Sequence, residues 1–189
     1  GDVRGVHAPV GAMTTPSIYV ADLAAYVAGR LHGEWINCED GAEVITGALK
    51  RIIATSPVPG AEELEIHDHE GWPCDPTELG LNPEKLTGAA TAVAESDLPF
   101  EAAQAFVAHV GSRYFTENPA DVVKEAEEAY VGCFRSYEEF GEEQAERFGE
   151  IPAFLTHYVD WERLGRDLAD GDENFSDDST GDVFVFRRN

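Results

Sequence analysis

Residues 17–23 (SIYVADL) decide the fold class, together with two segments that follow them. Their β-branched and aromatic side chains predict a strand. Gly29 is suited to a turn, and residues 34–36 (EWI) then predict a strand that returns alongside the first. Residues 63–68 (ELEIHD) alternate polar and apolar side chains, which predicts a third strand.

The rest of the chain carries helical patterns, most of them with a recognisable start. Asp40 followed by Glu43 predicts a capping box, and apolar residues at helical spacing then extend toward Pro57. Further start signals are Asn82 before Pro83, Pro99, Asn118 before Pro119, Ser136 with Glu139, and Asp160. A closing strand is predicted over residues 183–186. Because strands and helices are segregated, the sequence predicts an α+β fold with short antiparallel sheets and packed helices.

The composition is strongly acidic. Of the 189 residues, 37 are Asp or Glu and 13 are Lys or Arg, which gives a net charge of −24. Binding to nucleic-acid phosphates or to an anionic membrane surface needs clustered basic residues, so both are excluded as general modes. Hydrophobic residues still make up 43%, which is enough to build packed cores. No apolar run approaches the roughly 18 residues of a membrane-spanning helix.

The excess charge is spread over most of the chain. Residues 34–102 hold 15 acidic and 3 basic side chains (net −12), residues 116–150 hold 11 and 3 (net −8), and residues 160–182 hold 9 and 2 (net −7). A single acidic tail would indicate a solvated appendage. Charge distributed over folded elements instead indicates a surface that is itself a negative field.

Acidic side chains form stripes along two of the predicted helices. Like charges four residues apart destabilise a helix by roughly 0.2–0.5 kcal/mol per pair, so a helix selected for stability alone would alternate their sign. The stripes are Asp121, Glu125 and Glu128; Glu138, Glu142 and Glu146; and Glu139 with Glu143. The sequence tolerates this repulsion, which favours a role for the charge beyond stability. The alternative is a solvated face in a salt-adapted, lysine-poor protein.

Residues 67–70 (HDHE) are the main candidate for a metal site, since imidazole and carboxylate groups are both metal ligands. If the third strand continues through them, His67 and His69 point to one face. No third ligand has a recognisable spacing, so a polar strand end is the preferred interpretation. A metal-dependent hydrolase that uses these two histidines stays open as an alternative function.

The acidic run at residues 170–178 resembles a calcium loop only in part. Phe175 stands where that loop needs glycine, and Gly181 stands where it needs a bidentate glutamate, so we predict an acidic surface loop. The sequence has no nucleophile motif, no glycine-rich dinucleotide loop and no P-loop. We therefore predict that the protein is not an enzyme and uses no cofactor.

The cysteines and the single methionine bear on compartment and chain boundaries. Cys38, Cys74 and Cys133 are far apart and form no CxxC pair, which disfavours a disulfide framework or a zinc site and is typical of a reducing, cytoplasmic compartment. Met13 is the only methionine. We interpret it as the initiator, so that residues 1–13 are an expression remnant plus the initiator.

Four segments and the closing strand, in order along the chain, resemble the ArdA family of antirestriction proteins. They are residues 16–35 (PSIYVADLAAYVAGRLHGEW), 66–71 (IHDHEG), 130–140 (YVGCFRSYEEF), 158–168 (YVDWERLGRDL) and 183–186 (VFVF). His69 replaces a more usual tyrosine, and Phe134 occupies an aromatic position of the third segment. Several segments in register are more specific than any one of them alone.

The resemblance implies a small acidic protein, carried on mobile DNA, that inhibits type I restriction–modification enzymes by imitating B-form DNA and occupying the groove of their DNA-binding and methyltransferase subunits. It implies an elongated chain of three small domains that forms a homodimer through the last one. We place these domains at residues 14–80 (N-terminal α/β), 81–115 (small helical) and 116–189 (C-terminal α+β). It implies no catalytic residue. We expect no metal or cofactor, and the acidic charge predicts no direct binding to nucleic acid or membrane.

The carboxylates expected to imitate phosphates lie on the two striped helices and around the third strand. They are Glu62, Glu63, Glu65, Asp68, Glu70, Asp121, Glu125, Glu128, Glu138, Glu139, Glu142, Glu143 and Glu146. B-DNA carries one charge per roughly 1.7 Å of axis, so 24 net charges correspond to about 40 Å of duplex. An acidic decoy or chaperone for another basic partner is the remaining alternative.

Overall fold

The computed structural model describes residues 15–147, 151–152 and 154–188. The predicted expression remnant and Met13 lie outside these residues. The described chain divides into two compact units, residues 15–124 and residues 125–188. Each unit contains one three-stranded antiparallel sheet and packed helices, so the predicted α+β class is confirmed.

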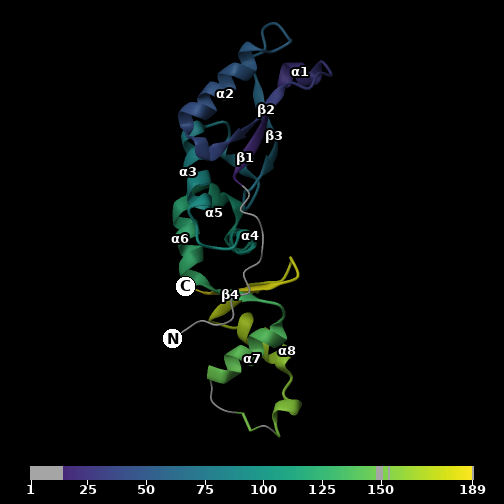
Figure 1. Cartoon of the computed structure of the whole chain (residues 1–189), viewed down its shortest axis with the longest axis vertical. Coiled ribbons are helices and arrows are strands. Elements are labelled where there is room, and N and C mark those ends of the chain that lie inside the picture. The colour runs from purple at the N-terminus through teal and green to yellow at the C-terminus, as the bar shows by residue number, and fades with distance from the viewer. Residues whose placement is uncertain (1–14, 148–150, 153, 189) are drawn as a thin grey trace. The chain divides into compact units, whose positions relative to one another are not determined.

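The sheet of the first unit has the order β2-β1-β3, and its three strands are the three predicted from the sequence (Figure 1). These are β1 (Ser17–Asp22), β2 (Gly33–Asn37) and β3 (Leu64–Glu70). Ile18 pairs with Ile36, and Val20 pairs with Ile66. All four side chains are buried, because paired residues share a face and this face carries the core.

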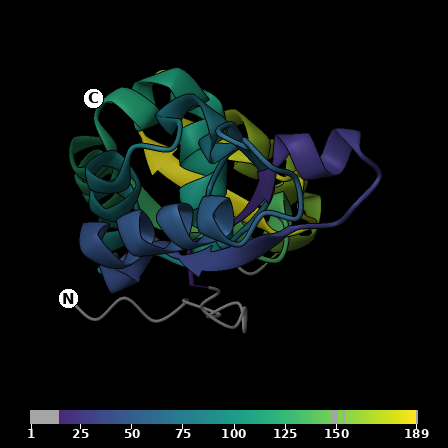
Figure 2. The ribbon, with the colours of Figure 1, turned by 90° about the horizontal axis from the view of Figure 1, so that it is seen from above.

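Helix α1 (Leu23–Val27) cuts short the predicted first strand. Asp22 begins it, since its Oδ1 accepts hydrogen bonds from the amides of Ala24 (3.0 Å) and Ala25 (3.2 Å). The Ser56 hydroxyl, followed by these two amides, lowers the pKa of Asp22 against the opposing effect of burial. The carboxylate that caps α1 is therefore charged at neutral pH. Helix α1 and the turn at Gly29 (φ 72°) project from the sheet (Figures 1 and 2).

Helix α2 (Ala42–Ala54) covers the core face of the sheet with Ile45, Ala48 and Ile52. The predicted Asp40 capping box is wrong. A short 3₁₀ turn, η1 (Cys38–Asp40), occupies these residues, and Asp40 accepts a hydrogen bond from the Asn37 side chain instead. The helix begins after Gly41, whose φ of 100° turns the chain in a way that other residues adopt only with strain.

Four helices complete the first unit and reach its boundary. They are α3 (Pro83–Ala94), α4 (Phe100–Val110), α5 (Ser112–Glu117) and α6 (Pro119–Ala129), preceded by the 3₁₀ turn η2 (Pro76–Leu79). The Asn82 start signal is confirmed, because its side chain accepts from the Lys85 amide at 2.9 Å. Helix α5 was not predicted; it buries Phe115 after a break at Gly111 (φ 97°).

The second unit has the sheet order β4-β6-β5. Its strands are β4 (Tyr130–Phe134), β5 (Asn174–Asp177) and β6 (Val183–Arg187), with helices α7 (Tyr137–Arg147) and α8 (Trp161–Ala169) and the 3₁₀ turn η3 (Thr156–Tyr158). The predicted acidic loop at residues 170–178 is therefore partly wrong. Asn174–Asp177 pairs with β6 as an edge strand, because the Phe175 side chain stacks on Phe186 and is buried against it.

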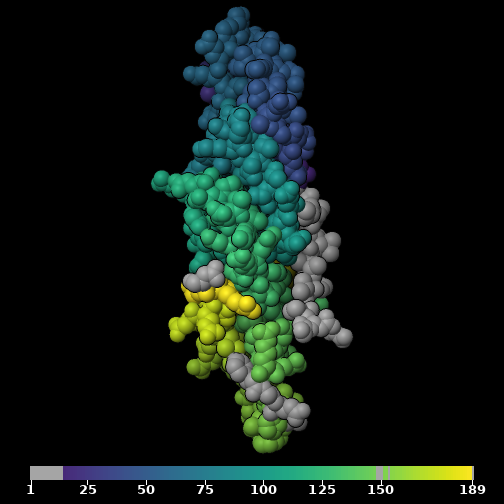
Figure 3. Space-filling view, turned by 90° about the vertical axis from the view of Figure 1, so that its left-hand side faces the viewer, coloured from purple at the N-terminus to yellow at the C-terminus, as the bar shows by residue number. Residues whose placement is uncertain are grey.

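Helices α7 and α8 pack with their backbones almost touching at two glycines. A Cβ atom on Gly165 would lie 1.8 Å from the Tyr137 carbonyl oxygen, and one on Gly141 would lie 2.4 Å from the Trp161 carbonyl oxygen. This close approach brings Phe140 and Ala169 into one core with β6. The outer side of α7 remains at the surface of this unit (green to yellow in Figure 3).

We predict that Gly165→Ala destabilises the second unit by about 3 kcal/mol or more, because no flexible side chain can move out of the way of the new methyl group. Gly88→Ala in α3 is the matched control. Its Cβ meets nothing within 4 Å, so the change should stabilise by about 0.5–1 kcal/mol. Urea unfolding followed by tryptophan fluorescence measures both, and equal effects would contradict the packing described.

Candidate partner-binding surface

The negative charge is divided equally between the two units. Residues 11–124 and residues 125–189 each hold 18 acidic and 6 basic side chains, so each has a net charge of 6 − 18 = −12. Both units are small, and their carboxylates lie mostly at the surface. Each unit is therefore the source of a strong negative field of its own.

Several of the basic side chains are held by carboxylates outside the predicted set. Arg51 binds Glu34 through two nitrogens, Arg113 binds Glu117 at 2.8 Å, and Arg166 binds Glu162 at 3.1 Å. A basic residue that is bound elsewhere on the same unit does not neutralise the predicted carboxylates. These pairs are exposed, so each contributes only about 0–1 kcal/mol to stability.

A β-bulge in β3 places three predicted carboxylates on one face of the first sheet. Tyr19 pairs with Asp68 but Val20 pairs with Ile66, so His67 is an extra residue in β3. Without it, simple alternation would put Glu65 and Asp68 on opposite faces. With it, Glu65, Asp68 and Glu70 all lie opposite alternate residues of β1 (Ala21, Tyr19 and Ser17) and point away from the core.

The same bulge separates the two histidines of the predicted metal alternative. His69 pairs with the core residue Ile18 and lies 3.9 Å from Asp75. His67 lies 3.7 Å from Glu65, and its ring contacts the ring of Tyr26 edge-on. The regular alternation on which a shared face for His67 and His69 depends is therefore interrupted at His67. Within the described residues, no three His, Cys, Asp or Glu side chains gather as metal ligands would.

The two carboxylates before β3 and the stripe on α6 are nearly all exposed. Glu62 and Glu63 are exposed at the approach to β3. On α6, Asp121 and Glu128 are exposed, whereas Glu125 is half-buried. The predicted spacing on this helix thus gives two outward carboxylates and one that the fold partly covers.

The two predicted rows on α7 differ in what they do. Glu138, Glu142 and Glu146 are all exposed, in agreement with one outward stripe. Glu139 instead accepts a 2.6 Å hydrogen bond from the Arg135 amide, while its own amide donates to the Ser136 hydroxyl. Glu143 is half-buried and lies 3.7 Å from Arg147. The second row therefore helps to start and hold the helix, which the capping-box pattern of Ser136 already indicated.

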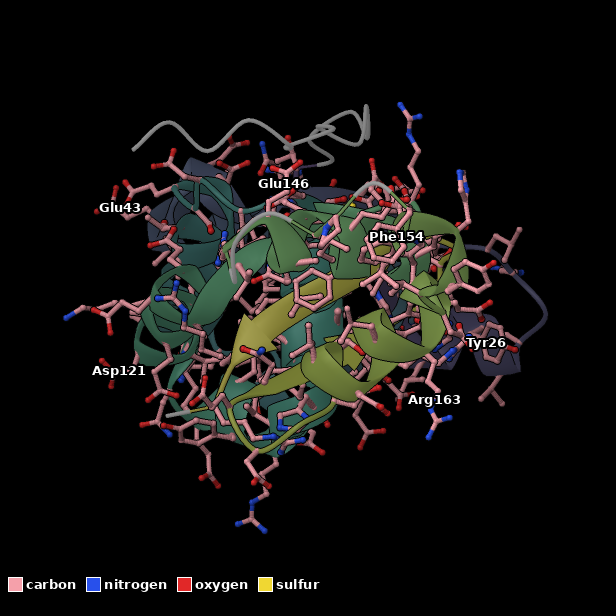
Figure 4. All side chains as sticks on the ribbon, turned by 90° about the horizontal axis from the view of Figure 1, so that it is seen from below. Tyr26, Glu43, Asp121, Glu146, Phe154 and Arg163 are labelled. Atoms are coloured by element: carbon pink, nitrogen blue, oxygen red, sulfur yellow. The ribbon has the colours of Figure 1, made fainter. Side chains whose placement is uncertain are left out.

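One carboxylate outside the predicted set, that of Glu43, shares the outward orientation of Asp121 and Glu146. Figure 4 shows Glu43, Asp121 and Glu146 each pointing away from the ribbon of its own unit. Glu43 lies in the first turn of α2, where a negative charge also stabilises the positive end of the helix. From the sequence, Glu43 was predicted only as part of a cap, although its charge and position gave no reason to leave it out of the set.

Two cysteines and one groove are further candidate places for reactive groups. Burial raises the pKa of the Cys38 thiol to about 12 and that of Cys74 to about 11, so neither is a nucleophile at neutral pH. An open groove between η2, α3 and α5 contains Glu78 and Arg113, but the Thr116 hydroxyl donates to Glu78 and Arg113 binds Glu117. Among the helices of the described segments, none is long and apolar enough to span a membrane.

We predict that the thermal midpoint of unfolding rises between about 0.1 M and 1 M NaCl, because the Debye length shrinks from about 10 Å to about 3 Å and screens the repulsion within each unit. The rise should be smaller near pH 4, where carboxylates begin to take up protons. A midpoint that falls with salt would contradict the account. Complete loss of the fold at the lower concentration would favour salt adaptation instead.

One comparison with known proteins finds a family whose model covers most of the chain. A family model described as "Antirestriction protein (ArdA)" matches residues 18–181, which run from β1 to the turn before β6 and include both units. No curated protein matches the chain. The matched family consists of antirestriction proteins, and it implies activity against type I restriction–modification enzymes. The chain therefore belongs to the ArdA family of antirestriction proteins.

Proposed function

We propose that the protein inhibits type I restriction–modification enzymes by imitating B-form DNA and occupying the groove through which these enzymes bind DNA. The observation that carries the proposal is the pair of units with a net charge of −12 each, on which 11 of the 13 predicted carboxylates are exposed and the other two, Glu125 and Glu143, are half-buried. A groove built for phosphates presents clustered Lys and Arg. Fixed carboxylates at high density are complementary to it.

The mechanism needs no chemical step. Opposite fields steer the two proteins together, which raises the association rate and makes it sensitive to salt. Once bound, the carboxylates exclude DNA because both ligands need the same basic side chains. Inhibition is then competitive and stoichiometric. Since each exposed charge pair contributes only about 0–1 kcal/mol, affinity comes from many weak contacts rather than from one anchor.

An acidic decoy for a different basic partner is the second candidate. The acidic composition alone is equally compatible with a histone-type or another basic partner. The family match favours the restriction enzyme, because the description of that family is antirestriction. Titration of the protein against a type I methyltransferase, in competition with its own DNA, separates these two candidates.

We also propose the arrangement of domains and the assembly that the family resemblance implies: three small domains, residues 14–80, 81–115 and 116–189, and a homodimer formed through the last one. The support within the second unit is a run of exposed apolar side chains around η3. Phe154 is 71% exposed, Leu155 41% and Tyr158 85%. A second copy of the chain would remove them from water.

We predict that Glu→Gln changes reduce inhibition gradually. Glu142→Gln alone should have little effect, because one exposed charge pair is worth no more than about 1 kcal/mol. The triple change of Glu138, Glu142 and Glu146 removes three such pairs and should weaken competition with DNA by roughly tenfold. The measurement is displacement of a fluorescent DNA duplex from a purified type I methyltransferase.

The matched control removes the same amount of charge elsewhere. Glu117→Gln, Glu162→Gln and Asp167→Asn together change carboxylates that the protein's own arginines already bind. This triple variant should compete more like the original protein. An equal reduction in the two triple variants would show that net charge alone matters, and complete loss of inhibition from Glu142→Gln would point to a single anchor.

For the homodimer, we predict an equilibrium sedimentation mass of two chains at micromolar concentration. Replacing Phe154 and Tyr158 together by Glu should reduce that mass to one chain, because two carboxylates would then have to be buried in an apolar contact. The control is Val44→Glu, since Val44 is also exposed but lies in the first unit. This change should leave the dimer intact. A single-chain mass for the unchanged protein would remove this part of the proposal.

A further inference from the structure

The outer face of the first sheet carries one exposed aromatic ring, that of Trp35, beside the half-buried ring of Tyr19. Trp35 of β2 and Asp68 of β3 both pair with Tyr19 of the central strand, so these three side chains form one row on the face opposite the core. The rings of Tyr19 and Trp35 lie 5.7 Å apart at a tilt of 53°. Trp35 is 46% exposed, which is unusual for a side chain with so much apolar surface.

The backbone is adapted to hold Tyr19 in this position. Gly33 lies on β2 beside Trp35, and a Cβ atom there would come within 2.9 Å of the Tyr19 hydroxyl oxygen and still closer to the Val20 carbonyl. A side chain at position 33 would therefore displace the tyrosine ring. The absence of that side chain leaves room for the Tyr19 ring in its position beside Trp35.

Carboxylates border these rings on the β3 side. Because of the bulge at His67, Glu65, Asp68 and Glu70 share the face with Tyr19 and Trp35. All three carboxylates are exposed. In the second unit, Arg166 lies over the ring of Tyr137 and Arg188 over the ring of Phe175. Among the described residues, no such cation lies over the rings of the outer face.

We propose that this face is a docking surface for arginine side chains of the partner protein, a proposal that rests on the function proposed above. The tryptophan and tyrosine rings accept the flat side of a guanidinium group, and the carboxylates of β3 accept its N–H donors. A basic DNA-binding groove supplies such arginines. Phosphate imitation alone would need carboxylates and no exposed tryptophan, so the rings provide a contact that DNA phosphates do not.

Arginine rather than lysine is the occupant that fits. A guanidinium group is planar, stacks on aromatic rings and is more weakly hydrated than an ammonium group. Both carry the same charge, so the carboxylates do not discriminate between them at long range. The discrimination should come from Trp35 and Tyr19, which makes it separable from the general attraction between acid and base.

The first test needs no restriction enzyme. Hexa-arginine and hexa-lysine peptides are titrated against the full chain, and binding is followed by isothermal calorimetry. We expect the arginine peptide to bind more tightly, and Trp35→Leu to reduce that preference by roughly 2- to 5-fold, the range for an exposed cation–π contact. Trp35→Phe should lose less of this preference for arginine, because an aromatic ring remains at the position. Tyr114→Leu, at another partly exposed aromatic on α5, should keep the preference.

The second test uses the enzyme. In the DNA displacement assay, Trp35→Leu should compete several-fold less well than the original protein, with a thermal midpoint within a few degrees of it. If the original protein competes and Trp35→Leu competes equally well, the arginine surface is wrong while the proposed function stands. If the original protein does not compete, the proposed function fails and the peptide preference decides the inference alone. Should Trp35→Leu fail to fold, Trp35→Thr, which removes the ring but keeps a side chain suited to a strand, decides in both assays, and an unchanged arginine preference would overturn the proposal.

Discussion

Mutual repulsion between carboxylates is the constraint on which the rest of this structure depends. Each unit has to fold around a small core while it keeps a net charge of −12 at its surface. The basic side chains could relieve this repulsion, but Arg51, Arg113 and Arg166 are bound to carboxylates away from the predicted stripes. Stability must then come from packing and backbone hydrogen bonds, which salt and charge affect least.

Three local features show how the fold meets this constraint. The contact of α7 and α8 at Gly141 and Gly165 lets two helices share a core with little side-chain volume between them. The buried, charged Asp22 ends β1 and begins α1 through its hydrogen bonds to backbone amides. The bulge at His67 changes the alternation of β3. The first two strengthen the units from within, and the third directs carboxylates outward.

The outer surface is more than a uniform coat of charge. The carboxylates of β3 share a face with Trp35 and Tyr19, whereas Glu138, Glu142 and Glu146 form an exposed row on α7. Glu139 belongs to the predicted stripes but serves the start of α7. A count of carboxylates thus overestimates the number that a partner can contact. The backbone geometry decides which carboxylates stay accessible to it.

Patterns that depend on nearest neighbours could be predicted from the sequence. The three strands of the first sheet, the Asn82 cap and the Ser136 start of α7 all follow from alternation or from side chains that bond their own backbone. The bulge at His67 could not be predicted, because a bulge is defined by the pairing of two strands and only one of them is local. Strand β5 was missed for a related reason. This acidic segment forms a strand because the ring of Phe175 stacks on that of Phe186 in β6, and β6 lies further along the chain. Asp40 does not cap α2, because its carboxylate accepts a hydrogen bond from the Asn37 side chain and the helix begins after Gly41.

The central claim is that fixed carboxylates stand in for phosphates in a basic groove. Its most direct test is the dissociation constant of the complex with a type I methyltransferase, measured at several salt concentrations beside that of a duplex on the same enzyme. The account predicts that log affinity falls steeply and linearly with log salt for both ligands, by more than about tenfold between about 50 mM and 200 mM NaCl. An affinity that does not change over this range would contradict it.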